Sequence, residues 1–270
     1  MCGIVGFTGR ENALPILIKG LYSLEYRGYD SAGIAAFTKE GLRVVKTRGR
    51  IANLEEKIRE VGCDMECTCG IGHTRWATHG EPSDRNSHPH LGGKGKVAVV
   101  HNGIIENYKE LRERLEAHGY EFKSETDTET VAHLVDYLHT GKQEDLAKTV
   151  LAAVQRLRGS YALGVVSMDN TQEIVAARRG NPLVIGIGEG ENMIASDITA
   201  IISRTRKFII LDDNEVAIVR PDEVIVMNEF GDKVEKEVQT VNWDMSAAEK
   251  GGYQHFMLKE IMEQPKAVTD

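Results

Sequence analysis

The second residue of the chain, Cys2, is the one whose type and position could do the most chemistry. Methionine aminopeptidases remove an initiator Met that stands before a small residue, so we expect a mature chain that begins with Cys2. Its thiol would then share a residue with an α-amine whose pKa is about 7.7–8.0, well below that of a lysine. Such an amine is the built-in base of an N-terminal nucleophile. An incidental cysteine in a frayed terminus is the alternative, so the argument depends on the rest of the chain.

A thiol that attacks an amide or ester also needs donors for the oxyanion, an anchor for the substrate and a proton for the leaving group. The α-amine of Cys2 can supply that proton. His101-Asn102-Gly103 ends a predicted strand, and an Asn side-chain NH2 beside a Gly backbone N–H suits a developing negative oxygen. An ordinary Asn-Gly turn is the alternative interpretation of these residues.

The candidate substrate anchors are a cation and an anion far apart in the sequence. Arg75 lies in the polar segment His73–Gly80, where its guanidinium can hold a carboxylate through two parallel hydrogen bonds. Asp127 lies in the first turn of a predicted helix, where it can receive an ammonium group. The alternatives are a surface Arg beside a core Trp, and a carboxylate that stabilises the helix dipole.

Other candidate motifs do not indicate a metal or a cofactor. The spacing Cys63-x3-Cys67-x-Cys69 lacks the paired C-x2-C form of structural zinc sites. His88-Pro89-His90 is more typical of a polar loop than of a chelating pair. The run of glycines from Gly186 to Gly190 has no helix after it, so a hairpin turn explains it better than a dinucleotide loop. We therefore expect no metal and no cofactor.

Composition restricts the class of protein. The chain has 270 residues and a formal net charge of −8, which argues against a nucleic-acid partner. It contains no run of 18 apolar residues, so no membrane span is predicted. The start lacks the basic and apolar regions of a signal peptide. We expect a cytoplasmic protein whose four cysteines are thiols.

The elements that must position these residues are grouped rather than strictly alternating. Apolar runs, turn residues and caps predict strands at 3–8, 32–38, 42–47, 70–74, 96–101, 161–168, 172–178, 182–187, 192–195, 207–211, 215–220 and 223–227. Helices are predicted at 12–25, 53–61, 106–118, 126–139, 143–157 and, as a short helix between strands, 197–203. Asn12 can cap the first, and Thr126-x-x-Glu129 has the form of a capping box. This grouping favours an α+β sandwich over a doubly wound parallel sheet.

The composition changes near residue 240. Residues 2–240 are expected to form one domain. Residues 241–270 contain Gly251-Gly252, mixed charges and an amphipathic stretch from His255 to Gln264. We interpret them as the start of a linker to a second domain that lies outside this chain.

Several strings occur together in a way that resembles a known family. They are Cys2–Gly6, Leu24–Gly33 (LEYRGYDSAG), His73–Gly80 (HTRWATHG), His101–Gly103 and Ser124–Glu129 (SETDTE). Together they resemble the glutaminase domain of the glutamine–fructose-6-phosphate aminotransferases (isomerising), the glucosamine-6-phosphate synthases. These are class II glutamine amidotransferases, for which the resemblance implies the four-layer αββα sandwich of N-terminal nucleophile hydrolases.

The resemblance also implies a role for each matching residue. Cys2 would be the nucleophile, and Asn102 with the Gly103 N–H would form the oxyanion hole. Arg75 would bind the α-carboxylate of glutamine, and Asp127 would accept its α-ammonium. Thr78, His79 and Gly80 would form the loop over glutamine, and Trp76 would be the aromatic residue at the ammonia exit. For Trp76 a plain packing role is the alternative.

The resemblance implies L-glutamine as substrate and L-glutamate as product. In a full-length protein, expected to be a homo-oligomer, the ammonia would convert fructose 6-phosphate to glucosamine 6-phosphate on a sugar-isomerase domain absent from this chain. The phosphoribosylpyrophosphate amidotransferases are the nearest alternative, but they differ at the second and third strings. A second alternative is an acylase, which would not need both Arg75 and Asp127. A third is a non-catalytic module, which would bind glutamine without turnover.

Overall fold

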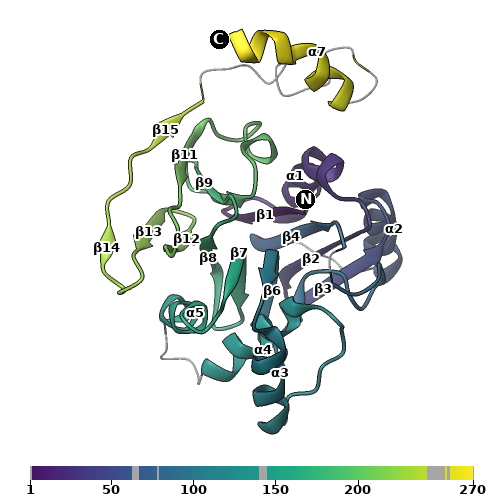
Figure 1. Ribbon diagram of the computed structural model, residues 1–270, viewed down its shortest axis with the longest axis vertical. Coiled ribbons are helices and arrows are strands. Elements are labelled where there is room, and N and C mark those ends of the chain that lie inside the picture. The colour runs from purple at the N-terminus through teal and green to yellow at the C-terminus, as the bar shows by residue number, and fades with distance from the viewer. Residues whose placement is uncertain are drawn as a thin grey trace.

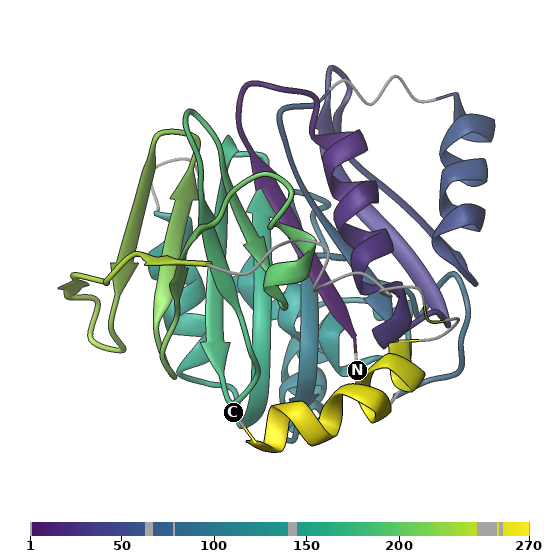
Figure 2. The same ribbon diagram turned by 90° about the horizontal axis from the view of Figure 1, so that it is seen from above.

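The computed structural model describes residues 2–62, 67–77, 79–139, 145–241, 253 and 256–269. Within this part of the chain, two antiparallel β-sheets pack face to face and helices cover their outer faces (Figure 1 and Figure 2). This four-layer αββα arrangement confirms the α+β class predicted from the grouping of elements.

The first sheet contains the strand that follows Cys2. Its strands are β1 (Gly3–Thr8), β2 (Ser31–Thr38), β3 (Gly41–Arg48), β4 (Cys69–Arg75), β9 (Val184–Ile187), β10 (Asn192–Ala195), β11 (Lys207–Ile210) and β15 (Gln239–Thr240). Their order among the described residues is β15-β11-β9-β10-β1-β4-β2-β3. Strand β1 is therefore central, between β10 and β4.

The second sheet contains the predicted oxyanion segment. Its strands are β5 (His90–Leu91), β6 (Val97–Ile105), β7 (Gly159–Ser167), β8 (Asn170–Arg179), β12 (Val216–Arg220), β13 (Glu223–Met227) and β14 (Lys233–Val234). Their order is β14-β13-β12-β8-β7-β6-β5 in the described part of the chain.

The helices form the two outer layers. The first sheet is covered by α1 (Ala13–Leu24) and α2 (Ile51–Val61), and the second by α3 (Tyr108–Ala117), α4 (Asp127–Leu138) and α5 (Leu146–Val154). Two short 3-10 helices are η1 (Glu25–Arg27) and η2 (Ile198–Ala200). The last helix, α7 (Phe256–Thr269), lies outside the four layers in Figure 1. No helix among the described residues is long and apolar enough to span a membrane.

Strand β1 is apolar throughout because both of its faces are buried. Ile4 belongs to the core between the two sheets, whereas Val5 and Phe7 pack in the core beneath α1. A strand buried on both faces loses the alternation of polar and apolar residues. Ile71 of β4 and Ile194 of β10 lie opposite Gly6 of β1 and belong to the same inter-sheet core as Ile4.

Most predicted elements are present with shifted ends, and two differ in kind. Asn12 caps α1 by accepting the Leu14 N–H at 3.1 Å, as predicted. The strand predicted to end at 101 instead runs to Ile105, so Asn102-Gly103 lies within β6 and is not a turn. The predicted helix at 197–203 is only the 3-10 turn η2. The predictions for Cys63, Thr78 and His255 fall outside the described residues.

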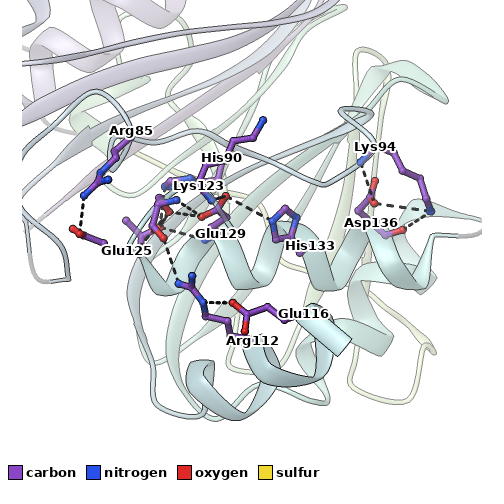
Figure 3. Close-up of polar contacts among 12 residues, drawn as sticks. Arg85, His90, Lys94, Arg112, Glu116, Lys123, Glu125, Glu129, His133 and Asp136 are labelled. Carbon is purple, nitrogen blue, oxygen red and sulfur yellow. Dashed lines mark hydrogen bonds and ion pairs between the residues drawn. The ribbon is translucent and has the colours of Figure 1, made fainter. Parts of the chain in front are cut away.

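A hydrogen-bond network at the start of α4 fixes the backbone around Asp127. The Thr126 hydroxyl accepts the Glu129 N–H at 3.3 Å, which is the predicted N-cap. The other half of the capping box is wrong: the Glu129 carboxylate instead accepts the N–H groups of Lys123 at 2.9 Å and Ser124 at 2.6 Å (Figure 3). One buried carboxylate thus orders the turn that leads into the helix.

The inter-sheet core predicts a large effect of removing Ile71, which is fully buried. Ile71→Ala should lower the free energy of unfolding by about 2–5 kcal/mol, because it removes buried methyl groups and leaves a cavity. Urea denaturation measures this change. The matched control Ile210→Ala, at a side chain 38% exposed, should cost no more than about 1 kcal/mol. Equal losses in both variants would contradict the assignment of the core.

The network at Glu129 predicts a pH-dependent stability. Burial raises its pKa, but the His133 imidazole, whose Nε2 lies 3.7 Å from the carboxylate, and hydrogen bonds from Lys123 and Ser124 outweigh burial and lower the pKa to about 2. The stabilisation is therefore present above the ordinary pKa and is lost as the pH falls towards the folded-state value. Between about pH 5 and pH 2, the free energy of unfolding of wild type should fall more steeply than that of Glu129→Gln.

Acid titration followed by urea denaturation at each pH measures these slopes. The control is Glu125→Gln, which alters a neighbouring carboxylate whose side chain is 52% exposed. It should keep the slope of wild type, and equal slopes for wild type and Glu129→Gln would overturn the prediction.

Candidate active site

Both sheets and one helix bring the predicted site residues together around one cavity. Cys2 directly precedes β1, and Arg75 ends the neighbouring strand β4. Asn102 and Gly103 lie in β6 of the facing sheet, and Asp127 is the first residue of α4. All five line a cavity of about 340 Å³, so the structure assembles the residues that the sequence separates.

The Cys2 thiol lies at the wall of this cavity. Its Sγ accepts a hydrogen bond from the Trp76 backbone N–H at 3.2 Å. Burial raises the pKa of the thiol, and the Trp76 N–H acts in the opposite direction because it stabilises the thiolate. Sγ is thus held in place by the backbone just after Arg75.

The Asn102 carboxamide faces Cys2 across the gap between the sheets. Its Nδ2 donates to the Cys2 carbonyl oxygen at 3.1 Å, and its Oδ1 lies 2.9 Å from His73 Nε2. The side chain is only 7% exposed, so the amide has little freedom to move. This places a hydrogen-bond donor beside Cys2, and its role in an oxyanion hole stays a prediction.

Gly103 occupies a position that only glycine fits. Its φ is +129°, which is outside the range that other L-residues ordinarily adopt. A Cβ built there would lie 2.1 Å from the Ser160 carbonyl oxygen of β7. The positive φ is accommodated within a paired strand, since Gly103 stays in register with Tyr161.

Arg75 is buried and uses its guanidinium to hold the loop that follows it. The group donates to the carbonyl oxygens of His79, of Gly80 at 3.1 Å and of Glu81 at 3.5 Å. Burial lowers its pKa, while the negative charge of Asp127 raises it. The alternative interpretation, a surface Arg beside a core Trp, is wrong: Arg75 is buried, at 3% exposed, whereas Trp76 is 46% exposed.

The predicted glutamine loop is only partly described. His79 packs edge-on against Tyr108 of α3 at a ring distance of 5.6 Å, and Gly80 has a φ of +73°. The exposed Trp76 ring meets Tyr29 edge-on at 5.6 Å at the rim of the cavity. Thr78 lies outside the described residues, so its predicted contact stays a prediction.

Asp127 is placed at the wall of the cavity by the network described above. Its Oδ2 accepts the Ile105 N–H at 2.9 Å, and the residue is 4% exposed. The same oxygen lies 4.0 Å from His101 Nδ1. A carboxylate and the guanidinium of Arg75 thus line one cavity, which suits a substrate that carries both charges.

The site also contains polar residues that were not predicted from the sequence. Arg27 lines the cavity and forms an ion pair with Asp197 at 3.0 Å. His88 also lines it, and the Asp30 carboxylate accepts the Ala77 N–H at 2.8 Å. Arg27 and Asp30 belong to the string LEYRGYDSAG, whose density of polar groups was the available signal.

Among the described residues, no group of His, Cys, Asp and Glu is arranged to hold a metal ion. His88 and His90 lie in the core of the site, where their rings contact edge-on at 5.1 Å. Burial lowers the pKa of each imidazole well below its ordinary value. His88 and Pro89 lie in a loop before β5, as predicted, but the two imidazoles are buried and form part of a packed wall of neutral rings.

Comparison with known proteins gives the family of the chain. A family described as "Glutamine amidotransferase domain" matches residues 73–203. A glutamine–fructose-6-phosphate aminotransferase (isomerizing) from Clostridium tetani is 53% identical over 270 residues, covering 100% of this chain and 44% of the relative. The protein of the same name from Caldanaerobacter subterraneus subsp. tengcongensis is 55% identical with the same coverage. The chain thus spans less than half the length of these curated relatives.

A solved structure shares the fold. The glutamine phosphoribosylpyrophosphate amidotransferase from B. subtilis, complexed with ADP and GMP, superposes with a TM-score of 0.70 at 27% identity. The match covers 84% of this chain and 49% of that structure. The chain therefore contains a glutamine amidotransferase domain, and it aligns over its whole length with glutamine–fructose-6-phosphate aminotransferases.

Proposed function

We propose that this chain is a glutaminase that hydrolyses L-glutamine to L-glutamate and ammonia through a γ-glutamyl thioester on Cys2. The observation that carries the proposal is the single cavity lined by Cys2, Asn102, Arg75 and Asp127. Glutamine is a zwitterion with a neutral side-chain amide. An anchored α-carboxylate and α-ammonium set its length against the thiol, so asparagine would fall one methylene short.

In the proposed reaction, the Cys2 thiolate attacks the γ-carboxamide carbon while the α-amine of Cys2 holds the thiol proton. The tetrahedral oxyanion is stabilised by Asn102 Nδ2–H and the Gly103 N–H. The ammonium then protonates the leaving nitrogen, so ammonia departs and a thioester remains. Water activated by the same amine cleaves the thioester, which releases glutamate and restores the thiol. This chemistry requires that Met1 be removed, because the amine is otherwise part of a peptide bond.

Arg75 links substrate binding to the loop above the site. Its present acceptors are the carbonyl oxygens of His79, Gly80 and Glu81. A carboxylate competes well for these donors, because it can accept two parallel hydrogen bonds from the guanidinium and carries the opposite charge, which a carbonyl oxygen does not. Binding of glutamine therefore rearranges the 79–81 backbone over the substrate.

The wider role follows from the relatives of the chain. We propose that residues 2–240 form the glutaminase domain and that residues 241–270 begin the linker to a sugar-isomerase domain. In the longer, homo-oligomeric protein, ammonia would aminate fructose 6-phosphate to give glucosamine 6-phosphate, and Trp76 would line its exit. The identity of 53–55% to these relatives, against 27% to the phosphoribosylpyrophosphate enzyme, favours this assignment over the alternative.

The nucleophile assignment is tested by labelling with a diazoketone analogue of glutamine. Intact mass should show that Met1 is absent and that wild type gains one adduct. Cys2→Ala should gain none and should release ammonia at the background rate. The control Cys67→Ala, which removes a buried thiol outside the cavity, should be labelled as fully as wild type. Full labelling of Cys2→Ala would contradict the proposal.

The anchor assignment predicts a separation of KM from kcat. Asp127→Asn keeps an acceptor for the Ile105 N–H but loses the charge that receives the α-ammonium. A hydrogen bond to a charged group is worth about 1.5–3 kcal/mol, so KM for glutamine should rise about 10- to 150-fold. Steady-state ammonia release measures this change.

The matched control for Asp127→Asn is Glu125→Gln, which alters a carboxylate two residues away that pairs with Arg85. Its KM should equal that of wild type. The anchor role of Asp127 would be refuted by an unchanged KM in Asp127→Asn, or by the same rise in both variants.

A further inference from the structure

His73 is fully buried in β4, and its imidazole reaches across to the facing sheet. Its Nε2 lies 3.0 Å from the His101 carbonyl oxygen and 2.9 Å from Asn102 Oδ1. Both acceptors belong to β6, whereas His73 belongs to the sheet that contains Cys2. One ring nitrogen therefore joins the strand of the anchor Arg75 to the strand of the proposed oxyanion hole.

The contacts determine which ring nitrogen carries the proton. A carbonyl oxygen only accepts hydrogen bonds, so the His101 oxygen requires a proton on Nε2. The other nitrogen, Nδ1, is buried and has no hydrogen-bond partner among the described residues. A neutral ring with its proton on Nε2 satisfies both β6 acceptors and leaves only a lone pair unpaired.

The same reasoning determines the orientation of the Asn102 carboxamide. With Oδ1 facing the Nε2–H of His73, Nδ2 faces the Cys2 carbonyl oxygen and donates to it. If the amide were turned by half a rotation, NH2 would face N–H and oxygen would face oxygen. Both contacts would then be repulsive, so His73 and the Cys2 carbonyl together permit a single orientation.

The orientation has a consequence for catalysis. An NH2 group has two protons, and the Cys2 carbonyl uses one of them. The other has no acceptor in the described part of the chain, and Asn102 lines the cavity. This second proton is the donor that an oxyanion on the substrate would use.

We propose that His73 is a positioning residue: it locks the Asn102 carboxamide with one N–H directed at the oxyanion. The proposal rests on the proposed glutaminase reaction and assigns its preorganisation to a residue that touches neither substrate nor nucleophile. His73 acts only through Asn102, and it does not itself transfer a proton.

The surroundings keep His73 in the required neutral form. Burial lowers its pKa to about 3, and the positive charge of Arg75 acts in the same direction. The ring stacks on His88 at a centroid distance of 4.2 Å, which restricts its rotation. At neutral pH the ring therefore remains a fixed donor.

The kinetic test compares two replacements of His73. Gln places an amide N–H near the position of Nε2, whereas Leu fills the space without a donor. Removal of a whole oxyanion donor typically costs about 10²–10³ in kcat, so His73→Leu should lower kcat about 10- to 100-fold. KM should change less than about threefold, since the α anchors are intact, and His73→Gln should recover most of the loss.

A double-mutant cycle tests whether the effect passes through Asn102. In an Asn102→Ala background, His73→Leu should change kcat by less than about twofold, because there is no carboxamide left to orient. The control His139→Leu removes a buried histidine that bonds Thr149 and Asp169 outside the cavity. It should lower stability and leave kcat unchanged. Additive losses in the cycle, or no recovery with Gln, would overturn the proposal.

Nuclear magnetic resonance separates this proposal from the glutaminase assignment. Long-range ¹H–¹⁵N spectra should show the His73 proton on Nε2, and the Asn102 carboxamide signals should shift in His73→Leu but not in His139→Leu. If these signals appear and wild type releases no ammonia, the proposed function fails and the orientation stands. If wild type is active but His73 carries its proton on Nδ1, the positioning role is refuted.

Discussion

The hydrogen bond from Asn102 Nδ2 to the Cys2 carbonyl is the contact on which the site depends. Cys2 leads into β1 of one sheet and Asn102 lies in β6 of the other, so the bond joins the two inner layers of the sandwich. Its length of 3.1 Å is maintained only if the sheets keep their separation. The apolar core around Ile4 and Ile71 sets that separation, and the packing of the interior therefore fixes the distance between Cys2 and the Asn102 carboxamide.

The charged residues of the site illustrate how preorganisation is achieved at a cost in stability. Arg75 and Asp127 are both buried, at 3% and 4% exposed. Burial of an ion is unfavourable unless hydrogen bonds compensate it. Loop carbonyls compensate Arg75, and the Ile105 N–H compensates Asp127. The protein thus satisfies its ions with backbone groups that a zwitterionic ligand can supplement or replace.

Structural features that depend on a few neighbouring residues were predicted correctly from the sequence. The caps at Asn12 and Thr126 are local hydrogen bonds, and their signals were sufficient. The alternative interpretation of Asn102-Gly103 as a turn was wrong, because these two residues lie within strand β6. At position 103 the carbonyl oxygen of Ser160 leaves no room for a side chain. The contact between His73 and Asn102 spans 29 residues and two sheets, so no local pattern encodes it. The residues of the site could be named from a resemblance, but their mutual orientation required the fold.

The backbone of Trp76 binds the Cys2 sulfur, while its half-exposed ring meets Tyr29 at the rim of the cavity. The chain has only two tryptophans, and the other is Trp243. Replacing Trp243 by Phe would leave a single tryptophan, whose backbone N–H contacts the Cys2 thiol. The emission of its indole would report the proposed acylation of the sulfur and movement of the loop in real time. The protein therefore contains, beside Cys2, an optical probe that needs no added dye.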